Sequence, residues 1–146
     1  MFQNGLFTAK PELLSDLFQQ TIDNTSAVIY IKDTKYRYIH VNRQWEQLIQ
    51  ATRGDIVGKT DFELFPPELA SGFRVNDERV LRTGESVKCE EVAPHSDGPH
   101  TYLSVKFPLR DDLGQIVAMA GISTDITDRV LARKEKIGRA SCRERV

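Results

Sequence analysis

The sequence predicts an α+β domain, in which an antiparallel sheet of about five strands carries helices over one face. Short runs of β-branched and aromatic residues flank turn formers, as in β-hairpins, and a helical stretch separates the first two runs from the later ones. The chain has 146 residues, of which 40% are hydrophobic and 28% charged, as is typical of one globular domain.

The first third of the chain predicts a flanking helix, a hairpin and a second helix. Apolar residues recur at helical spacing over residues 11–23, and Pro11 suits a first helical turn. Residues 27–32 (AVIYIK) and 36–41 (YRYIHV) are rich in β-branched and aromatic residues and predict paired strands. Asn42 is placed to cap the helix that follows, because its amide oxygen accepts hydrogen bonds from free helix N–H groups.

The middle of the chain predicts two further helical segments. Asp61 is expected to cap a short turn (DFELF) that ends at Pro66, since the residue before a proline avoids the helical conformation. Apolar residues then recur along one side of a longer helix over 68–82, and Asn76 lies on that side. Gly84 suits the stop just beyond this helix.

The last third predicts strands over 87–92, 101–109 and 116–124, followed by a charged, helix-prone segment from Asp125. Asp97-Gly98 is the turn signal between the first two of these strands. Residues 101–109 alternate between apolar and polar side chains, which is the pattern of a half-buried strand. Residues 116–124 are apolar throughout, so both faces need a cover, which the N-terminal helix or a second protomer would supply.

Charge and composition narrow the expected partners. The 20 Lys+Arg and 21 Asp+Glu give a net charge of −1, which predicts no basic surface for nucleic acid or an anionic membrane. No apolar run is long enough to span a bilayer, and the N-terminus lacks the layout of a signal peptide. Two cysteines, Cys89 and Cys142, are too few for a disulfide framework. We expect a soluble, cytoplasmic domain with no nucleic-acid partner and no direct membrane insertion, although the full-length protein can still be membrane-tethered.

The last ten residues, 137–146 (IGRASCRERV), are interpreted as a non-native addition. The codons ATC GGA AGA GCG TCG TGT AGG GAA AGA GTG encode this string, and that DNA looks like a common adapter of short-read sequencing. Removing its three arginines and one glutamate from the 20 basic and 21 acidic residues leaves 17 and 20, a net charge of −3. The alternative is a natural basic tail. Segments of foreign origin are excluded from fold reasoning, and we expect further native sequence beyond residue 136.

Several motifs resemble, in their order and spacing, those of PAS sensor domains of the S-box type. They are the hairpin IYIKDTKYRYIHVN before the helix with Trp45, the loop GDIVGKTDFELFPPE, the helix ending VLRTGE, the stretch YLSVKFPLRDDLGQ and the terminal GISTDITDR. The resemblance covers roughly residues 14–129, and the closing Asp-Ile-Thr-x-Arg element is its most specific part.

The resemblance implies a sensory module of a longer signalling protein, such as a histidine kinase, a diguanylate cyclase or a cyclic-dinucleotide phosphodiesterase. It divides the chain into a flanking helix (1–23), a PAS domain (24–127) and the start of a signalling helix (128–136), before the tail at 137–146. Such domains bind small ligands, form homodimers through the outer sheet face and flanking helices, or both. They pass a signal through the last helix to an effector downstream in cis, so the fragment itself is not expected to be an enzyme.

By the same resemblance, a ligand pocket is expected between the sheet and the helices. A filled core is the competing interpretation and is preferred for the aromatic residues. Asn76 and Ser123 are the sharper candidates, because an inward polar group needs a partner. The candidate pocket residues are Phe62, Phe65, Phe73, Asn76, Val80, Leu103, Val105, Phe107, Met119, Gly121 and Ser123.

At the exit from the last strand, Asp125, Thr127 and Arg129 are the candidate signal relay. Asp125 and Thr127 carry short oxygen-bearing side chains that can cap the next helix. Arg129 sits in its first turn, where the helix dipole disfavours a cation without a carboxylate partner. We predict a latch in which Asp125 or another acid holds Arg129, with simple helix capping as the alternative of nearly equal weight.

The resemblance also bears on cofactors. The photoreactive flavin branch needs a cysteine in the region that here is DFELFPPE, and haem-binding members commonly use a histidine from the long helix, where 68–82 has none. Both cofactors are therefore disfavoured, whereas a non-covalent flavin or another organic ligand is compatible. The histidines His40, His95 and His100 are scattered without a metal-ligand spacing, so no metal site is expected. His95 and His100 can meet across the hairpin as a solvated pair.

Two rival functions stay open beside the ligand sensor. The first is a ligand-free interaction module, in which the same fold only dimerises. The second is a small α+β enzyme with a pocket, which needs an inward acid or base with a perturbed pKa. The sequence nominates no such group, and the adjacent pair Glu90-Glu91 points to opposite faces of a strand.

Overall fold

The protein, described by a computed structural model over residues 10–144, folds into one antiparallel sheet with helices across it. Residues 1–9 and 145–146, which belong to the predicted flanking segment and tail, lie outside the described residues. The helices are α1 (Pro11–Asp23), α2 (Arg43–Ile49), α3 (Arg53–Ile56), α4 (Asp61–Leu64), α5 (Pro67–Thr83) and α6 (Thr127–Glu144). The strands are β1 (Val28–Asp33), β2 (Tyr38–Val41), β3 (Val87–His95), β4 (Gly98–Arg110) and β5 (Ile116–Asp125).

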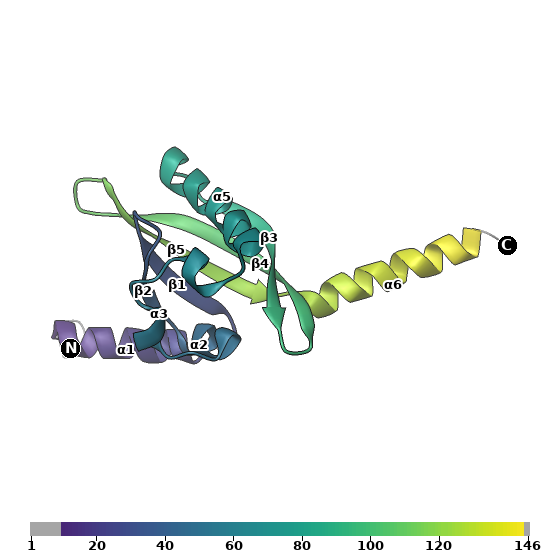
Figure 1. Ribbon diagram of the computed structural model, residues 1–146, viewed down its shortest axis with the longest axis horizontal. Helices are drawn as coiled ribbons and strands as arrows, with labels where there is room; N and C mark the ends of the chain where they lie inside the picture. Colours follow the sequence, from purple (N-terminus) through teal and green to yellow (C-terminus); the bar gives the residue numbers. More distant parts are fainter. Residues whose placement is uncertain (1–9, 145–146) are drawn as a thin grey trace, which may run out of the picture.

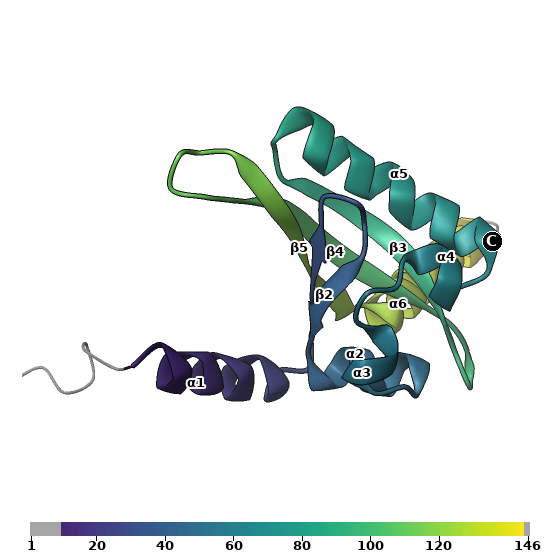
Figure 2. The same cartoon turned by 60° about the vertical axis from the view of Figure 1, so that its left-hand side comes forward.

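The five strands are ordered β2-β1-β5-β4-β3, so that the first and last strands of the domain pair at its centre. Helices α2 to α5 lie on one side of this sheet, with α5 along β3 and β4 (Figure 2). Helices α1 and α6 extend away from opposite ends of the domain (Figure 1). This arrangement confirms the predicted α+β class, and among the described residues no helix is long and apolar enough to cross a membrane.

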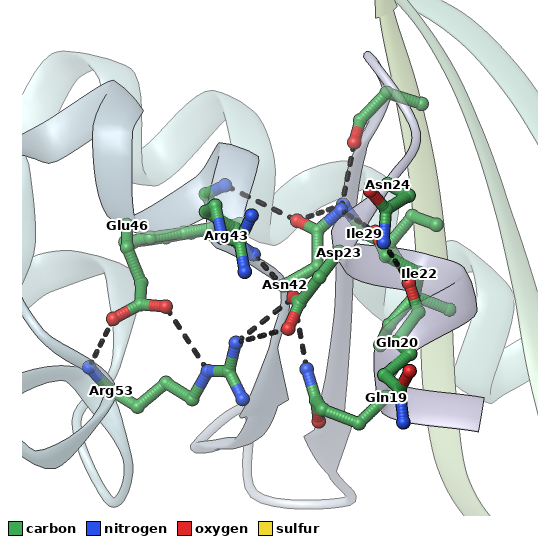
Figure 3. A network of polar contacts seen from close by, with 12 residues as sticks. Gln19, Gln20, Ile22, Asp23, Asn24, Ile29, Asn42, Arg43, Glu46 and Arg53 are labelled. Atoms are coloured by element: carbon green, nitrogen blue, oxygen red, sulfur yellow. Dashed lines mark hydrogen bonds and ion pairs between the residues drawn. The ribbon is translucent and has the colours of Figure 1, made fainter. Parts of the chain in front are cut away.

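Asn42 joins three elements where the hairpin ends. Its side-chain oxygen accepts from the backbone N–H of Trp45 at 3.2 Å and of Ile29 at 3.0 Å. Its amide nitrogen donates to the carbonyls of Ile22 at 2.7 Å and Ala27 at 2.9 Å. The predicted cap of α2 is thus confirmed, and the fully buried amide also ties the end of α1 to β1 (Figure 3).

A second network holds α1 to the domain from the surface. The Arg53 guanidinium contacts Asp23 at 2.9 Å and Glu46 at 3.1 Å (Figure 3). Burial raises the pKa of Asp23, but hydrogen bonds from Gln19, Arg53 and the N–H of Arg43 outweigh it and hold that pKa below its ordinary value. Ile22, near the end of α1, is buried, but four other apolar side chains of this helix are 40–62% exposed, namely Leu13, Leu14, Leu17 and Phe18.

The hydrophobic core is an edge-to-face chain of aromatic rings between sheet and helices. Tyr30, Tyr38, Trp45, Phe65 and Phe73 follow one another with ring centroids 4.8–5.9 Å apart, a favourable geometry for aromatic pairs. The Tyr30 ring crosses β5 over Gly121, where an added Cβ would lie 2.2 Å from it. Only a glycine leaves room for this ring.

The strands of the β3–β4 hairpin are longer than predicted. β3 continues to His95 and β4 begins at Gly98, so the turn is the two residues Ser96-Asp97. Gly98 has a φ of 118°, which L side chains rarely adopt. Backbone pairing between β3 and β4 extends beyond the residues that the alternation of side chains identified. This extension places the turn near the start of α6.

Candidate functional site

A cavity of about 50 Å³ lies between the sheet and helices α2, α4 and α5. One wall is aromatic and the other is polar, and the polar wall comes from strands β1, β3, β4 and β5 and from α4. The lining residues are Val28, Tyr30, Lys32, Tyr38, Trp45, Leu48, Asp61, Phe65, Phe73, Glu91, Ala93, Tyr102, Ser104, Lys106 and Ser123.

The polar wall belongs to a buried ionic cluster, formed by Lys32, Asp61, Asp77, Glu91 and Lys106. Lys32 contacts Asp61 at 2.5 Å and Asp77 at 2.6 Å. Lys106 contacts the other oxygen of Asp77 at 2.8 Å and Glu91 at 2.9 Å. Both lysines and both aspartates are 0–1% exposed, so Asp77 bridges two ammonium groups away from water.

Two neutral side chains complete the cluster from outside. The Tyr38 hydroxyl donates to Asp61 at 2.5 Å, and the Asn76 amide donates to Glu91 at 3.0 Å. Burying charges is costly unless they are paired and hydrogen-bonded, and these two bonds fill acceptor positions that the lysines leave open. The polar partner that Asn76 was expected to need is therefore Glu91.

Secondary structure explains how the cluster is positioned. The inward positions of β1 end at Lys32, and the inward positions of β4 are Tyr102, Ser104 and Lys106. Asp61 does not cap α4 as predicted. Thr60 and Glu63 form a capping box at that helix instead, which leaves the Asp61 carboxylate to accept from Lys32 and Tyr38.

Electrostatics favour the charged forms of Asp77 and Lys106. Burial raises the pKa of Asp77, but Lys32 and Lys106 outweigh this effect and hold that pKa below its ordinary value. Burial lowers the pKa of Lys106, but Tyr30, Asp77 and Glu91 raise it well above normal. Burial, followed by Asp61, raises the pKa of Tyr38. The pKa values of Asp77 and Lys106 are thus shifted away from neutral pH, which suits ligand binding rather than proton transfer.

The geometry leaves hydrogen-bonding capacity at the cavity. An ammonium group has three donors, and the structure gives each cluster lysine two carboxylate partners. Ser104 and Ser123 share a hydrogen bond of 2.8 Å between their hydroxyls on the same wall. The cavity therefore offers donors opposite an aromatic surface, a combination that orients small polar aromatic ligands.

The structure places the predicted pocket residues in different surroundings. Phe65, Phe73 and Ser123 line the cavity. Val80 and Met119 are fully buried in a separate small cluster with Val87. Gly121 lies beneath Tyr30, and Phe62 is 46% exposed with the Arg74 guanidinium over its ring.

The orientation predicted for β4 is wrong. Leu103, Val105 and Phe107 face away from the cavity, because their neighbours Ser104 and Lys106 pair with Ser123 and Gly121 on the inward side. Alternating apolar and polar residues show that a strand has two different faces, but they do not show which face is buried. Here the polar face is inward, because Asp77 and Glu91 compensate Lys106.

Sequence reasoning missed Lys32, Asp61, Asp77 and Lys106 as site residues. Each looks like an ordinary surface charge in its own segment, and their pairing joins positions up to 45 residues apart. The available signal was that Lys32 occupies the inward phase of a strand with buried Val28 and Tyr30.

The exit junction differs from the predicted latch. One oxygen of Asp125 accepts from the N–H of Thr127 at 2.9 Å and from its hydroxyl at 2.6 Å, as the capping interpretation requires. The other oxygen faces His100 Nδ1 at 2.6 Å. Within the described residues, His100 rather than Arg129 is the ion-pair partner of Asp125, because Arg129 lies on the exposed side of α6.

Similar proteins occur among signalling enzymes. Residues 22–131 match the family model described as PAS fold. The chain is 38% identical over 113 residues to the methanogenesis regulatory histidine kinase FilI of Methanothrix harundinacea, covering 76% of this chain and 12% of the kinase. It is 27% identical over 138 residues to a diguanylate cyclase of Vibrio cholerae, covering 92% of this chain and 40% of the cyclase. The chain thus spans a minor part of either relative.

Solved structures share the fold. VqmA of Vibrio cholerae, in a complex with a ligand and DNA, matches with a TM-score of 0.68 and 31% identity, covering 84% of this chain and 54% of that one. The PAS domain of BvgS from Bordetella pertussis matches with a TM-score of 0.68 and 24% identity, covering 88% and 98%.

The VqmA complex corrects one prediction. The near-zero net charge was interpreted as excluding nucleic acid from the partners, whereas this similar protein is held in a complex with DNA. The charge of one domain does not describe the rest of a longer chain, and the match covers only 54% of VqmA.

The family match extends over residues 22–131, and the β2-β1-β5-β4-β3 sheet with its covering helices has the architecture of the matched domains. This chain belongs to the PAS fold family, as a sensory-type domain of the kind that occurs in histidine kinases and diguanylate cyclases.

Proposed function

We propose that this PAS domain senses a small, uncharged, planar organic ligand in the cavity beside the buried ionic cluster. The observation that carries the proposal is the pair of lysines, each with donor capacity left, opposite the rings of Tyr38, Trp45 and Phe65. A ligand with acceptor atoms on a flat apolar skeleton would satisfy both walls. The carboxyl groups on the same wall disfavour an anion by repulsion.

The size of the cavity supports a small ligand. Its volume of about 50 Å³ is well below the roughly 300 Å³ at which typical drug-sized pockets begin. A large cofactor would require displacement of the aromatic chain. The chain is also 30% identical, over 85% of its length, to VqmA bound to DPO, which is why DPO belongs among the first compounds tested.

The signal would leave through β4 and β5. Lys106 pairs with Gly121 across these strands, and Tyr102, which lines the cavity, pairs with Asp125. Asp125 holds the first turn of α6 through Thr127. A ligand that accepts a hydrogen bond from Lys106 would therefore shift the strand pair that positions α6. Helix α6 would carry that shift to an effector such as a histidine kinase or a diguanylate cyclase.

Thermal unfolding with a panel of small neutral heteroaromatic compounds, DPO included, tests the proposal. A ligand that binds only the folded state raises the midpoint, and at 100 times its Kd it stabilises by about 2.7 kcal/mol. We expect Lys106→Met to abolish this shift, and Lys88→Met, an exposed lysine of β3, to retain it. Circular dichroism establishes that both variants fold.

Tyr38→Phe provides a second check, because it keeps the ring and removes only the hydroxyl that donates to Asp61. A panel that leaves the midpoint unchanged would favour the ligand-free interaction module. A shift of equal size in wild type and Lys106→Met would place the ligand elsewhere.

A further inference from the structure

The β3–β4 hairpin gathers side chains that the cavity does not use. His95, Asp97 and His100 each offer one ligand atom, and these atoms lie within 4.8 Å of one another. The spacing His-x-Asp-x-x-His matches no familiar motif in sequence. The two-residue turn brings these residues together in space. It pairs Ala93 with His100 and His95 with Gly98, and so places both imidazoles at one end of the sheet.

Asp125 orients His100, which contacts both Asp125 and Asp97. His100 Nδ1 lies 2.6 Å from Asp125, and His100 Nε2 lies 2.8 Å from Asp97. A histidine that ligates a metal almost always donates its other ring N–H to a carboxylate, a backbone carbonyl or water, which fixes the tautomer and the ring orientation. Asp125 already occupies that place, and it comes from a different strand than the hairpin.

We propose that His95, Asp97 and His100 form a binding site for a divalent transition-metal ion, of which Zn²⁺ is the representative, with Asp125 as the group that positions His100. Two imidazoles and one carboxylate are ligands that suit zinc and its neighbours in the first transition row, and three protein ligands leave a position for water.

The side chains must move for the ion to bind, and the movements are local. Zn–N bonds are about 2.0–2.1 Å, so the ligand atoms of a tetrahedral ion lie roughly 3.3 Å apart, closer than the present spread. The rings of His95 and His100 are stacked at 3.7 Å and 14°. Because a ring nitrogen binds in the plane of its ring, His95 has to tilt and release the Tyr102 hydroxyl, now at 2.7 Å.

Asp97 is free to follow, since its side chain is 72% exposed. The required adjustments are therefore rotations of side chains at the tip of a hairpin, and the strand pairing can stay as it is.

The position of the site gives it a consequence for signalling. The hairpin turn lies beside the start of α6 (Figure 1), and Asp97, His100 and Asp125 line a common surface depression with Thr127 and Leu131. An ion held by the hairpin would fix His100 against Asp125, and Asp125 holds the first turn of α6. This input lies outside the cavity and goes beyond the proposed ligand sensing.

Calorimetric titration of the purified chain with ZnCl₂, together with the visible absorption of bound Co²⁺, tests the site. We expect one ion per chain with micromolar affinity, and absorption bands of low-symmetry cobalt. His100→Ala and Asp97→Asn should each weaken binding at least tenfold. Asp112→Asn is the matched control, because it removes a carboxylate from the tip of the other hairpin, where Asp112 is also exposed.

Asp125→Asn distinguishes positioning of His100 from direct ligation of the metal ion. This variant should weaken metal binding while leaving the number of metal ligands unchanged. Wild type that binds no Zn²⁺ at a concentration of about 100 μM would overturn the proposal. Binding that His100→Ala and Asp97→Asn leave unchanged would also overturn it, because the ion would then sit elsewhere.

Discussion

Two ionic networks in this domain pair basic with acidic side chains in opposite surroundings. In the buried ionic cluster, the side chains of Lys32, Asp77 and Lys106 are 0–1% exposed. The network of Arg53 with Asp23 and Glu46 joins α1 to the domain at a surface where Arg53 is 33% exposed.

The comparison teaches that contact distance does not measure energetic weight. The distances in both networks fall between 2.5 and 3.1 Å. Water screens the exposed network, and each broken contact there can be replaced by hydration. Removing one partner from the buried cluster leaves an uncompensated charge without water, so its loss is far more costly.

The largest expected effect is at Asp77. Asp77→Asn keeps the shape but removes the charge that bridges Lys32 and Lys106. We expect it to lower the free energy of unfolding by about 3–5 kcal/mol, measured by urea denaturation at pH 7. A loss of unfolding free energy below about 1 kcal/mol would show that water reaches the cluster. The two networks would then not differ in energetic weight.

The next effect tests the packing beside the buried cluster. Gly121→Ala places a methyl group against the Tyr30 ring, and we expect a loss of about 1–3 kcal/mol in the same assay. Gly72→Ala is the matched control in α5, where an added Cβ meets nothing within 4 Å. That control should be neutral or stabilise by up to about 1 kcal/mol. Equal behaviour of the two variants would contradict tight packing over β5.

A smaller effect is expected at Arg53. Arg53→Ala removes both contacts of the surface network, and we expect a loss of about 1 kcal/mol or less that shrinks further in 1 M NaCl. Arg37→Ala, which breaks the exposed pair with Asp33, should cost less still. A loss at Arg53 as large as that at Asp77 would mean that attachment of α1 is part of the folding core.

The smallest expected effect is the acid dependence of Asp23. Its folded pKa is lowered, so its ionised form contributes stability that is complete above the unfolded pKa of about 3.9 and is lost as the pH falls through the folded pKa. Asp23→Asn lacks this contribution, and its stability should fall less steeply below about pH 4 than that of wild type. Parallel curves for the two proteins would contradict a lowered pKa at Asp23.

Local patterns predicted most of the elements. Helix α1 over Pro11–Asp23, the Asn42 cap and the glycine stop at Gly84 were correct, because each depends on residues within a few positions of one another. The error at Asp61, in contrast, depends on a contact with a residue distant in sequence. Asp61 and Thr60 are both good caps, and only the reach of Lys32 from β1 decides which of them the helix uses.

The candidate site was predictable only in part. Phe65, Phe73 and Ser123, which were among the candidate pocket residues, line the cavity, but its charged wall was not anticipated. A lysine in a strand is ordinarily a surface residue, and Lys106 is buried only because Asp77 and Glu91 arrive from α5 and β3.

Spacing along the chain was sufficient to identify the class of fold and the order of its elements, because periodicity and turn chemistry act over short distances. The family was indicated by the resemblance of the motifs to those of a known family. The packed molecule alone decided which face of β4 is buried, which charges meet in the cavity and which residue holds Asp125. Those outcomes depend on free energies of burial that become favourable only when partners distant in sequence arrive together.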